Sequence, residues 1–177
     1  MFVILGAGAS ALAADGSERG DRPGASMTVL RIRTEDPEIA QAMAQAIEWS
    51  DTFRGVVEAI EHTDGVVWVH RGQCRGASAC LLTYLEVSGP NRLLRIHVDP
   101  QRSGARLMES LGHEFQHAVE VLGSSARSSA GVYHFFNEQA HGYRNGGRFE
   151  TKEAMKAGLA VSREVARARR LTSGARP

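Results

Sequence analysis

The chain has 177 residues, a length that suits one domain with tails and leaves little room for a second domain. Its 21 Lys and Arg residues nearly balance its 20 Asp and Glu residues, so the formal net charge is +1. This balance argues against binding of nucleic acid or an anionic membrane through a basic surface. The densest basic stretch, at 167–170, is typical of cations at the C-terminal end of a helix.

The N-terminal segment predicts export from the cell. Residues 2–14 are apolar and rich in small side chains, and the Ala-Leu-Ala tripeptide that ends at Ala13 has the small-x-small form of a signal-peptidase site. We therefore expect a signal peptide over 1–14 and a linker or N-terminal extension over 15–34. The apolar stretch is shorter than the roughly 20 residues of a membrane-spanning helix. The protein is accordingly expected to be periplasmic or secreted, with no stable membrane span.

The two cysteines, Cys74 and Cys80, flank an expected turn between two strands. Cysteines at the base of a turn between antiparallel strands can reach bridging distance. In an exported protein the oxidising compartment favours a disulfide between them, whereas a cytosolic protein would keep two thiols. Together with the signal peptide, this favours the disulfide.

Two amphipathic helices are expected after segment 27–34, which is either a short strand or part of an extended linker. From Pro37 onward apolar residues recur at helical spacing: Ile39, Ala42, Met43, Ala46 and Ile47. Ser50 is the expected N-cap of the second helix, whose apolar residues are Phe53, Val56, Val57 and Ile60.

Three strands are expected next, at 65–70, 80–87 and 92–98, with Gly-Pro-Asn at 89–91 as the turn before the third. Taken in chain order, they predict an antiparallel meander. Because the sequence has helices before these strands and further helices after them, it predicts an α+β fold with a small antiparallel sheet.

Two further helices complete the prediction. One spans about 103–122 and is followed by a Gly- and Ser-rich break at 123–131. The other is long and C-terminal, over about 149–170, with three residues expected to be buried: Met155, Leu159 and Val165.

The first of these two helices contains the sequence HEFQH at 113–117. Residues four apart share a helix face, so His113 and His117 can direct ring nitrogens at one tetrahedral zinc ion. Glu114 lies at the flank of that face, where its carboxylate can accept a proton from the water that zinc activates. The apolar residues fall on the opposite arc: Leu107, Met108, Leu111, Phe115, Ala118, Val119 and Leu122. This arrangement argues against core histidines and leaves a solvated surface pair as the alternative to a metal site.

A catalytic zinc ion normally has three protein ligands and one open position, so a third ligand is needed. Glu120 lies one turn after His117, and it suits a hydrogen bond to a ligand imidazole better than metal binding. Glu138 and Glu150 are both chemically competent as the third ligand. The residue pattern by itself leaves both open.

The motif HEFQH is that of the zincin metallopeptidases. The longer string HEFQHAVE, followed by RFET at 148–151, resembles a group of small exported bacterial proteins of gluzincin type. That group has HExQHAxE, then FET at the head of a terminal helix, and a similar cysteine pair before the motif. The resemblance covers roughly residues 35–170. It implies a minimal zincin-like metallohydrolase domain over 35–177, with Glu150 as the third zinc ligand.

The predicted function is hydrolysis of peptide bonds by a zinc-activated water, with Glu114 as general base. A peptide or protein substrate is expected because, in zincins, a sheet edge beside the cleft holds an extended peptide, and strand 93–99 directly precedes the motif helix. The alternative is a non-catalytic metal-binding or structural envelope protein that retains the scaffold. Several residues after the motif could donate a hydrogen bond to a developing oxyanion: Tyr133, His134, His141, Tyr143 and Arg144.

Overall fold

The computed structural model describes residues 31–139 and 149–174. The expected signal peptide, and all but the last four residues of the extension at 15–34, lie outside the described residues. The described elements, in chain order, are β1 (Ile32–Arg33), α1 (Pro37–Trp49), α2 (Asp51–Glu61), β2 (Gly65–Arg71), β3 (Ala79–Leu81), β4 (Glu86–Ser88), β5 (Asn91–Val98), α3 (Gly104–Gly123), α4 (Ser129–Gln139) and α5 (Lys152–Gly174).

The first two helices form as the sequence predicts. Pro37 occupies the first turn of α1, where its missing N–H costs no hydrogen bond, and the Asp36 carboxylate caps the helix by accepting the backbone N–H of Ile39 at 2.9 Å. The hydroxyl of Ser50 caps α2 by accepting the backbone N–H of Phe53 at 3.0 Å. The same hydroxyl donates to the carboxylate of Glu164 on α5 at 2.5 Å, so it also ties the α1–α2 corner to the last helix.

The sheet is mixed, and the expectation of an antiparallel meander is wrong. The strand order is β1-β2-β5-β3, with β4 also paired to β5. Strands β1 and β2 are parallel, as are β2 and β5, whereas β3 and β4 run antiparallel to β5. The meander assumed that strands adjacent in the chain pair with one another. Instead, β5 inserts between β2 and the pair β3 and β4, so the chain between β2 and β5 runs along the far edge of β5.

The strand expected at 80–87 is interrupted. Residues 82–85 separate β3 from β4, and Leu85 there turns toward α4: its backbone N–H donates to the hydroxyl of Ser129 at 3.1 Å. The turn at 89–91 forms as expected, since β4 and β5 pair through Ser88 and Asn91, and Gly89 adopts a φ of 57°. This hydrogen bond therefore connects the sheet edge to α4, a helix that the sequence did not predict.

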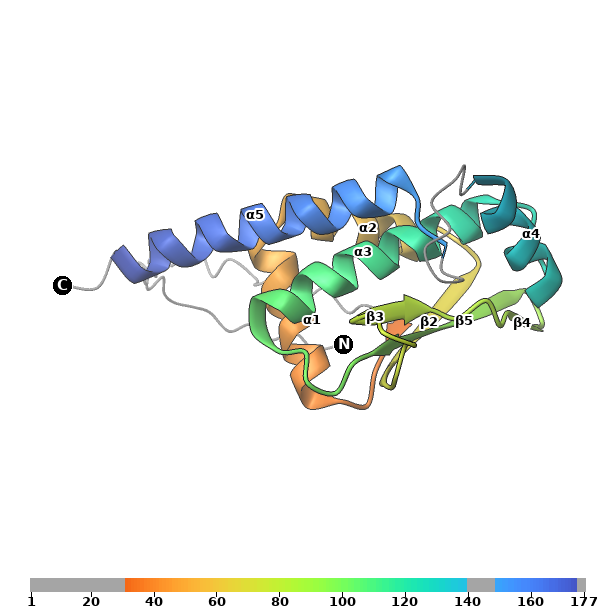
Figure 1. Ribbon diagram of the computed structural model, residues 1–177, viewed down its shortest axis with the longest axis horizontal. Coiled ribbons are helices and arrows are strands. Elements are labelled where there is room, and N and C mark those ends of the chain that lie inside the picture. Colours follow the sequence, from red (N-terminus) through yellow and green to blue (C-terminus); the bar gives the residue numbers. More distant parts are fainter. Residues whose placement is uncertain (1–30, 140–148, 175–177) are drawn as a thin grey trace, which may run out of the picture.

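The helices cover one face of the sheet. In Figure 1, α3 lies between the sheet and α5, and α5 runs along the outer side of α3 and extends beyond it. In β5, residues Leu94, Ile96 and Val98 face the core and are fully buried, and the alternate residues are only partly covered. Helix α3 is therefore packed against the sheet on one side and against α5 on the other. Side chains of α3 that point toward α5 lie between the two helices.

Helices α3 and α5 approach closely at two glycines. A Cβ at Gly112 would lie 2.7 Å from Val161 Cγ2, and a Cβ at Gly158 would lie 3.1 Å from His113 Cβ. Val165 is buried as predicted, but Met155 and Leu159 are 38% and 50% exposed, so that part of the prediction is wrong. The interface instead uses small residues, and this lets the start of α5 reach the histidines of α3.

A buried arginine donates hydrogen bonds to the backbone carbonyls at the C-terminal end of α3. The guanidinium of Arg92, on β5, donates to backbone carbonyls of Val121, Ser124 and Ala126 and pairs with the carboxylate of Asp64. A cation is favoured here because the last carbonyls of a helix have no partner within it. In turn, this arginine lowers the pKa of Asp64 by hydrogen bonding to its carboxylate.

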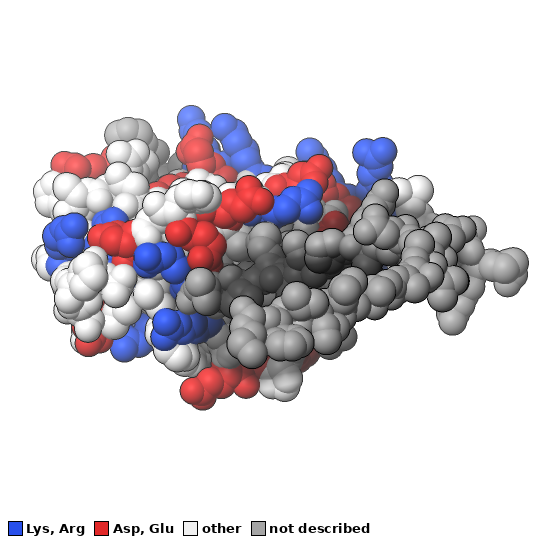
Figure 2. All heavy atoms as spheres, turned by 180° about the vertical axis from the view of Figure 1, so that it is seen from behind, with Lys and Arg blue, Asp and Glu red and all other residues white. Residues whose placement is uncertain are grey.

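The surface charges are mixed. On the face seen in Figure 2, basic and acidic side chains intermingle over the described part of the chain. None of the described helices combines the length and apolar character that crossing a bilayer requires.

Candidate metal centre

The side chains of His113 and His117 extend from α3 toward the segment just before α5. Glu150 lies in that segment and contacts His113. Glu150 Oε2 lies 3.1 Å from His113 Nε2 and 4.0 Å from His117 Nε2. The centroids of the two imidazole rings are 4.8 Å apart, and the ring planes are inclined by 79°. His117 is buried, with 4% of its surface exposed, which excludes the alternative of a solvated surface pair.

Thr151 places Glu150 at the head of α5. Its hydroxyl oxygen caps the helix by accepting the backbone N–H of Ala154 at 3.1 Å. The hydroxyl proton is donated to Glu120 Oε1 on α3 at 2.7 Å. Thus one threonine both starts α5 and attaches its first turn to the motif helix, so the residue before it faces the histidines.

Glu120 also orients His117. Its second carboxylate oxygen, Oε2, lies 3.1 Å from His117 Nδ1. A carboxylate only accepts hydrogen bonds when ionised, so this contact places the imidazole proton on Nδ1 and leaves the lone pair on Nε2. Nε2 is the nitrogen that faces Glu150. The expected contact of Glu120 with an imidazole of the motif is thus present, and its role beside a metal ligand stays a prediction.

Glu114 is buried, with 6% of its surface exposed, and one carboxylate oxygen accepts the backbone N–H of Leu81 on β3 at 2.6 Å. Burial raises the pKa of this carboxyl above its ordinary value, although the two histidines and the Leu81 amide oppose the shift. Burial alone would lower the pKa of His113, but the hydrogen bond to Glu150 and the nearby carboxylates raise it above 6.5. Both shifts describe the polypeptide alone, and a cation at this position would push both pKa values down.

The residues fit a divalent metal. Ligand atoms of His113, His117 and Glu150 all lie within 4.8 Å of one another. In a tetrahedral zinc site with bonds of about 2.0–2.1 Å, ligand atoms are about 3.3 Å apart. The distances of 3.1 and 4.0 Å to Glu150 bracket that value. Two imidazoles and one carboxylate are also the donor set of one class of catalytic zinc site.

Glu138, the other candidate for the third ligand, is not part of this group. It lies on α4 with 66% of its side chain exposed, and its carboxylate is 3.4 Å from His134 Nδ1. Of the loop residues considered as oxyanion donors, Tyr133 and His134 lie on α4, whereas His141, Tyr143 and Arg144 lie outside the described residues.

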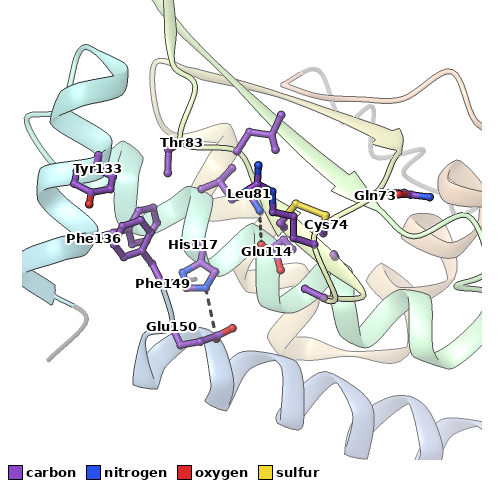
Figure 3. Close-up of a pocket in the computed structure, with 15 residues that line it drawn as sticks. Gln73, Cys74, Leu81, Thr83, Glu114, His117, Tyr133, Phe136, Phe149 and Glu150 are labelled. Atoms are coloured by element: carbon purple, nitrogen blue, oxygen red, sulfur yellow. Dashed lines mark hydrogen bonds and ion pairs between the residues drawn. A yellow bond between two sulfur atoms is a disulfide. The ribbon is translucent and has the colours of Figure 1, made fainter. Parts of the chain in front are cut away.

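A cavity of about 420 Å³ opens beside the histidines (Figure 3). Glu114, His117 and Glu150 line its base, and three aromatic side chains form one wall: Tyr133, Phe136 and Phe149. The Phe136 ring packs edge-on against the His117 ring, with 5.3 Å between the ring centroids. It also stacks on the Phe149 ring, with 5.5 Å between the centroids. The sequence did not predict this wall, although Val132 and Phe136, four residues apart after a serine-rich stretch, were a signal for α4.

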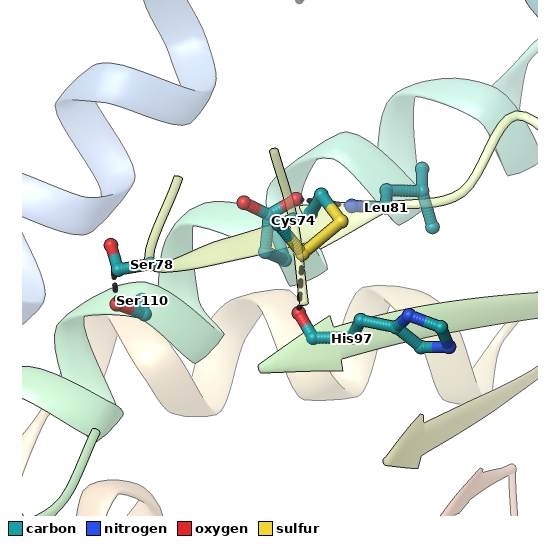
Figure 4. The surroundings of a disulfide bond; sticks show 7 residues. Cys74, Ser78, Leu81, His97 and Ser110 are labelled. Carbon is teal, nitrogen blue, oxygen red and sulfur yellow. Dashed lines mark hydrogen bonds between the residues drawn. A yellow bond between two sulfur atoms is a disulfide. The ribbon is translucent and has the colours of Figure 1, made fainter. Parts of the chain in front are cut away.

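The predicted disulfide between Cys74 and Cys80 is present and lies on the opposite wall of this cavity. Figure 4 shows it above α3 and beside β5, where Cys74 Sγ contacts the backbone carbonyl of His97 at 3.5 Å. The crosslink closes the short loop that leads into β3. It therefore holds in place the strand whose Leu81 amide binds Glu114.

Fold and site together define a mixed α+β protein with a His₂Glu group between two packed helices and a buried glutamate beside it. No family model, curated protein or solved structure matches the chain. The geometry of the site is therefore the basis for assigning a function.

Proposed function

We propose that the protein is a zinc-dependent metallopeptidase of minimal zincin-like form, with His113, His117 and Glu150 as metal ligands and Glu114 as general base. The observation that carries this proposal is the convergence of three ligand atoms, two from α3 and one from the residue before the cap of α5, next to a buried carboxylate in an open cavity. Glu120, behind His117, is the residue type that commonly supports a metal-ligating imidazole.

When bound, zinc supplies a water of lowered pKa and polarises the carbonyl of the scissile bond. Glu114 would act as the base that takes a proton from the attacking water, and as the acid that returns it. The same carboxyl then gives the proton to the departing amine nitrogen as the C–N bond breaks. The Leu81 amide holds one oxygen of Glu114, so the other is positioned for this transfer.

A peptide substrate is supported by the outer edge of β3, with which no strand of the described residues pairs. The Asp99 N–H donates to the Ser78 carbonyl and the Leu82 N–H donates to the Arg95 carbonyl, so Ser78 and Leu82 face β5. The alternating residues Ala79 and Leu81 therefore direct their backbone groups to the other side, where both line the cavity. The Leu81 N–H is bound there to Glu114, which leaves the backbone groups of Ala79 and the Leu81 carbonyl for a substrate. An extended peptide can pair there. Strand β5, which the sequence reading favoured, lies between β2 and β3 and has no free edge.

Export follows as part of this proposal. The proposed location is the periplasm or the outside of the cell, and the disulfide between Cys74 and Cys80 is compatible with such an oxidising compartment.

The deciding experiment compares wild type with Glu114→Gln on a broad peptide library, with zinc content measured by elemental analysis. We expect hydrolysis to disappear in the variant while one zinc per chain remains. Glu150→Ala should lose the zinc, and the matched control Glu138→Ala should keep it. A wild type that binds zinc but is as inert as Glu114→Gln would instead support a non-catalytic metal-binding protein, and a wild type that binds no zinc would refute the site.

A further inference from the structure

A second cavity, of about 870 Å³, lies next to the metal centre and carries positive charge. Its walls are the disulfide loop and the segment 99–106 that leads into α3, and three arginines line it: Arg75, Arg102 and Arg106. Among its lining residues, Asp99 is the only acidic one, and its carboxylate already accepts the backbone N–H of Gln101 at 2.8 Å. The cavity therefore has an excess of positive charge.

The guanidinium groups of Arg102 and Arg106 differ from the structural arginines of this fold. Arg71 pairs with Asp36, and Arg92 pairs with Asp64. Within residues 31–139 and 149–174, no carboxylate lies within ion-pair distance of Arg102 or Arg106. The backbone of Arg102 is nevertheless fixed, because its carbonyl accepts a hydrogen bond from Arg71 at 2.7 Å. The positive end of α3, which begins at Gly104, adds to the potential here.

This basic cavity shares wall residues with the cavities of the proposed active site, among them Cys74 and Arg102. Arg102 also lines a cavity of about 420 Å³ whose other walls include His113, Glu114 and Glu150. Glu114 and Glu150 also line the cavity with the aromatic wall (Figure 3). The aromatic cavity and the arginine cavity therefore both adjoin the cavity that holds the candidate metal ligands.

We propose that Arg102 and Arg106 form a carboxylate subsite, so that the enzyme selects peptides with a carboxylate on the Arg102 side of the scissile bond. The inference rests on the proposed peptidase function. Guanidinium groups bind carboxylates through paired, charge-assisted hydrogen bonds. In a peptide, that carboxylate is either an acidic side chain or the free C-terminus.

The test measures binding, so it does not depend on turnover. The protein is zinc-loaded Glu114→Gln, and the probes are alanine hexapeptides labelled with fluorescein at the N-terminus and containing one phenylalanine. One set has glutamate at each remaining position in turn and an amidated C-terminus. A second set has glutamine instead of glutamate, and a third has glutamine with a free C-terminal carboxylate. Fluorescence anisotropy gives each dissociation constant.

We expect the glutamate set at one position, or the free-carboxylate set, to bind at least about tenfold more tightly than the amidated glutamine set. Adding Arg102→Gln and Arg106→Gln should reduce this ratio to about one. The control Arg167→Gln removes one positive charge from the exposed outer part of α5 and should preserve the ratio.

A ratio near one in the parent, or an unchanged ratio in the double arginine variant, overturns the subsite. Tight binding of the glutamate set identifies a side-chain carboxylate as the ligand, and tight binding of the third set identifies the C-terminus. The cleavage assay of wild type against Glu114→Gln tests the peptidase proposal separately, so failure of one proposal is distinguishable from failure of the other.

Discussion

The packing of α3 against α5 predicts that Gly112→Ala destabilises the protein. The new Cβ would lie 2.7 Å from Val161 Cγ2, whereas carbon atoms in contact are normally about 3.5–4.0 Å apart. Val161 is fully buried and β-branched, so its side chain has little freedom to move away. Overpacking of this kind costs about 1–3 kcal/mol, and the better helix propensity of alanine returns about 1 kcal/mol. We expect a net loss of up to about 2 kcal/mol in the free energy of unfolding.

Gly55→Ala is the matched control, because a Cβ at this exposed position in α2 meets no atom within 4 Å. It should stabilise the protein by about 0.5–1 kcal/mol. Urea unfolding, followed by circular dichroism with chelator present, gives both values. A Val161→Ala background removes the contact at 2.7 Å and leaves the Cβ of residue 161 as the nearest atom, at 3.3 Å, so Gly112→Ala should there be less destabilising. If Gly112→Ala stabilises the wild-type background as much as Gly55→Ala does, the close-packing argument is wrong.

Two further predictions concern the site and the acid stability of the fold. Glu120→Gln should weaken zinc binding by about 10- to 100-fold, because His117 loses its carboxylate partner. Competition with a chromophoric chelator measures this affinity. The control Glu153→Gln changes an exposed carboxylate and should leave the affinity unchanged. Burial alone would raise the pKa of Glu164, but hydrogen bonds from Ser50 and Thr52 hold it below 4.5. Its stabilising effect is therefore present above about pH 4.5 and is lost as the pH falls through the lowered pKa, so Glu164→Gln should flatten the acid limb of a stability–pH curve. An equally steep limb in the variant would contradict this assignment.

Local signals in the chain predicted the parts of the fold that depend on neighbouring residues. Ser50 marked the boundary between α1 and α2, since a cap requires only a hydroxyl and the next turn. The pairing of Cys74 with Cys80 is likewise short in range, and the structure confirms it. The periodic apolar residues around His113 also predicted the span of α3 to within about two residues.

The features that the sequence reading missed depend on contacts between distant segments. The parallel pairing of β2 with β5 leaves no mark on either strand, because alternating side chains look the same in both directions. The bond from the Leu81 amide to Glu114 involves a backbone group, which any residue at 81 would supply. Arg92 is buried against the carbonyls at the end of α3, yet in the sequence it looks like one more charge in a strand.

In the proposed site, Thr151 and Glu120 couple the binding of a metal to the docking of the start of α5. Thr151 caps α5 and donates to Glu120, and Glu120 in turn contacts His117 Nδ1. Glu150 is the residue immediately before this cap, so it reaches His113 only when the first turn of α5 is seated on α3. A ligand that binds the seated arrangement stabilises it by mass action. The proposed third ligand lies 33 residues beyond the proposed second one in the chain, and a helix cap that also supports a histidine of the motif brings the two together.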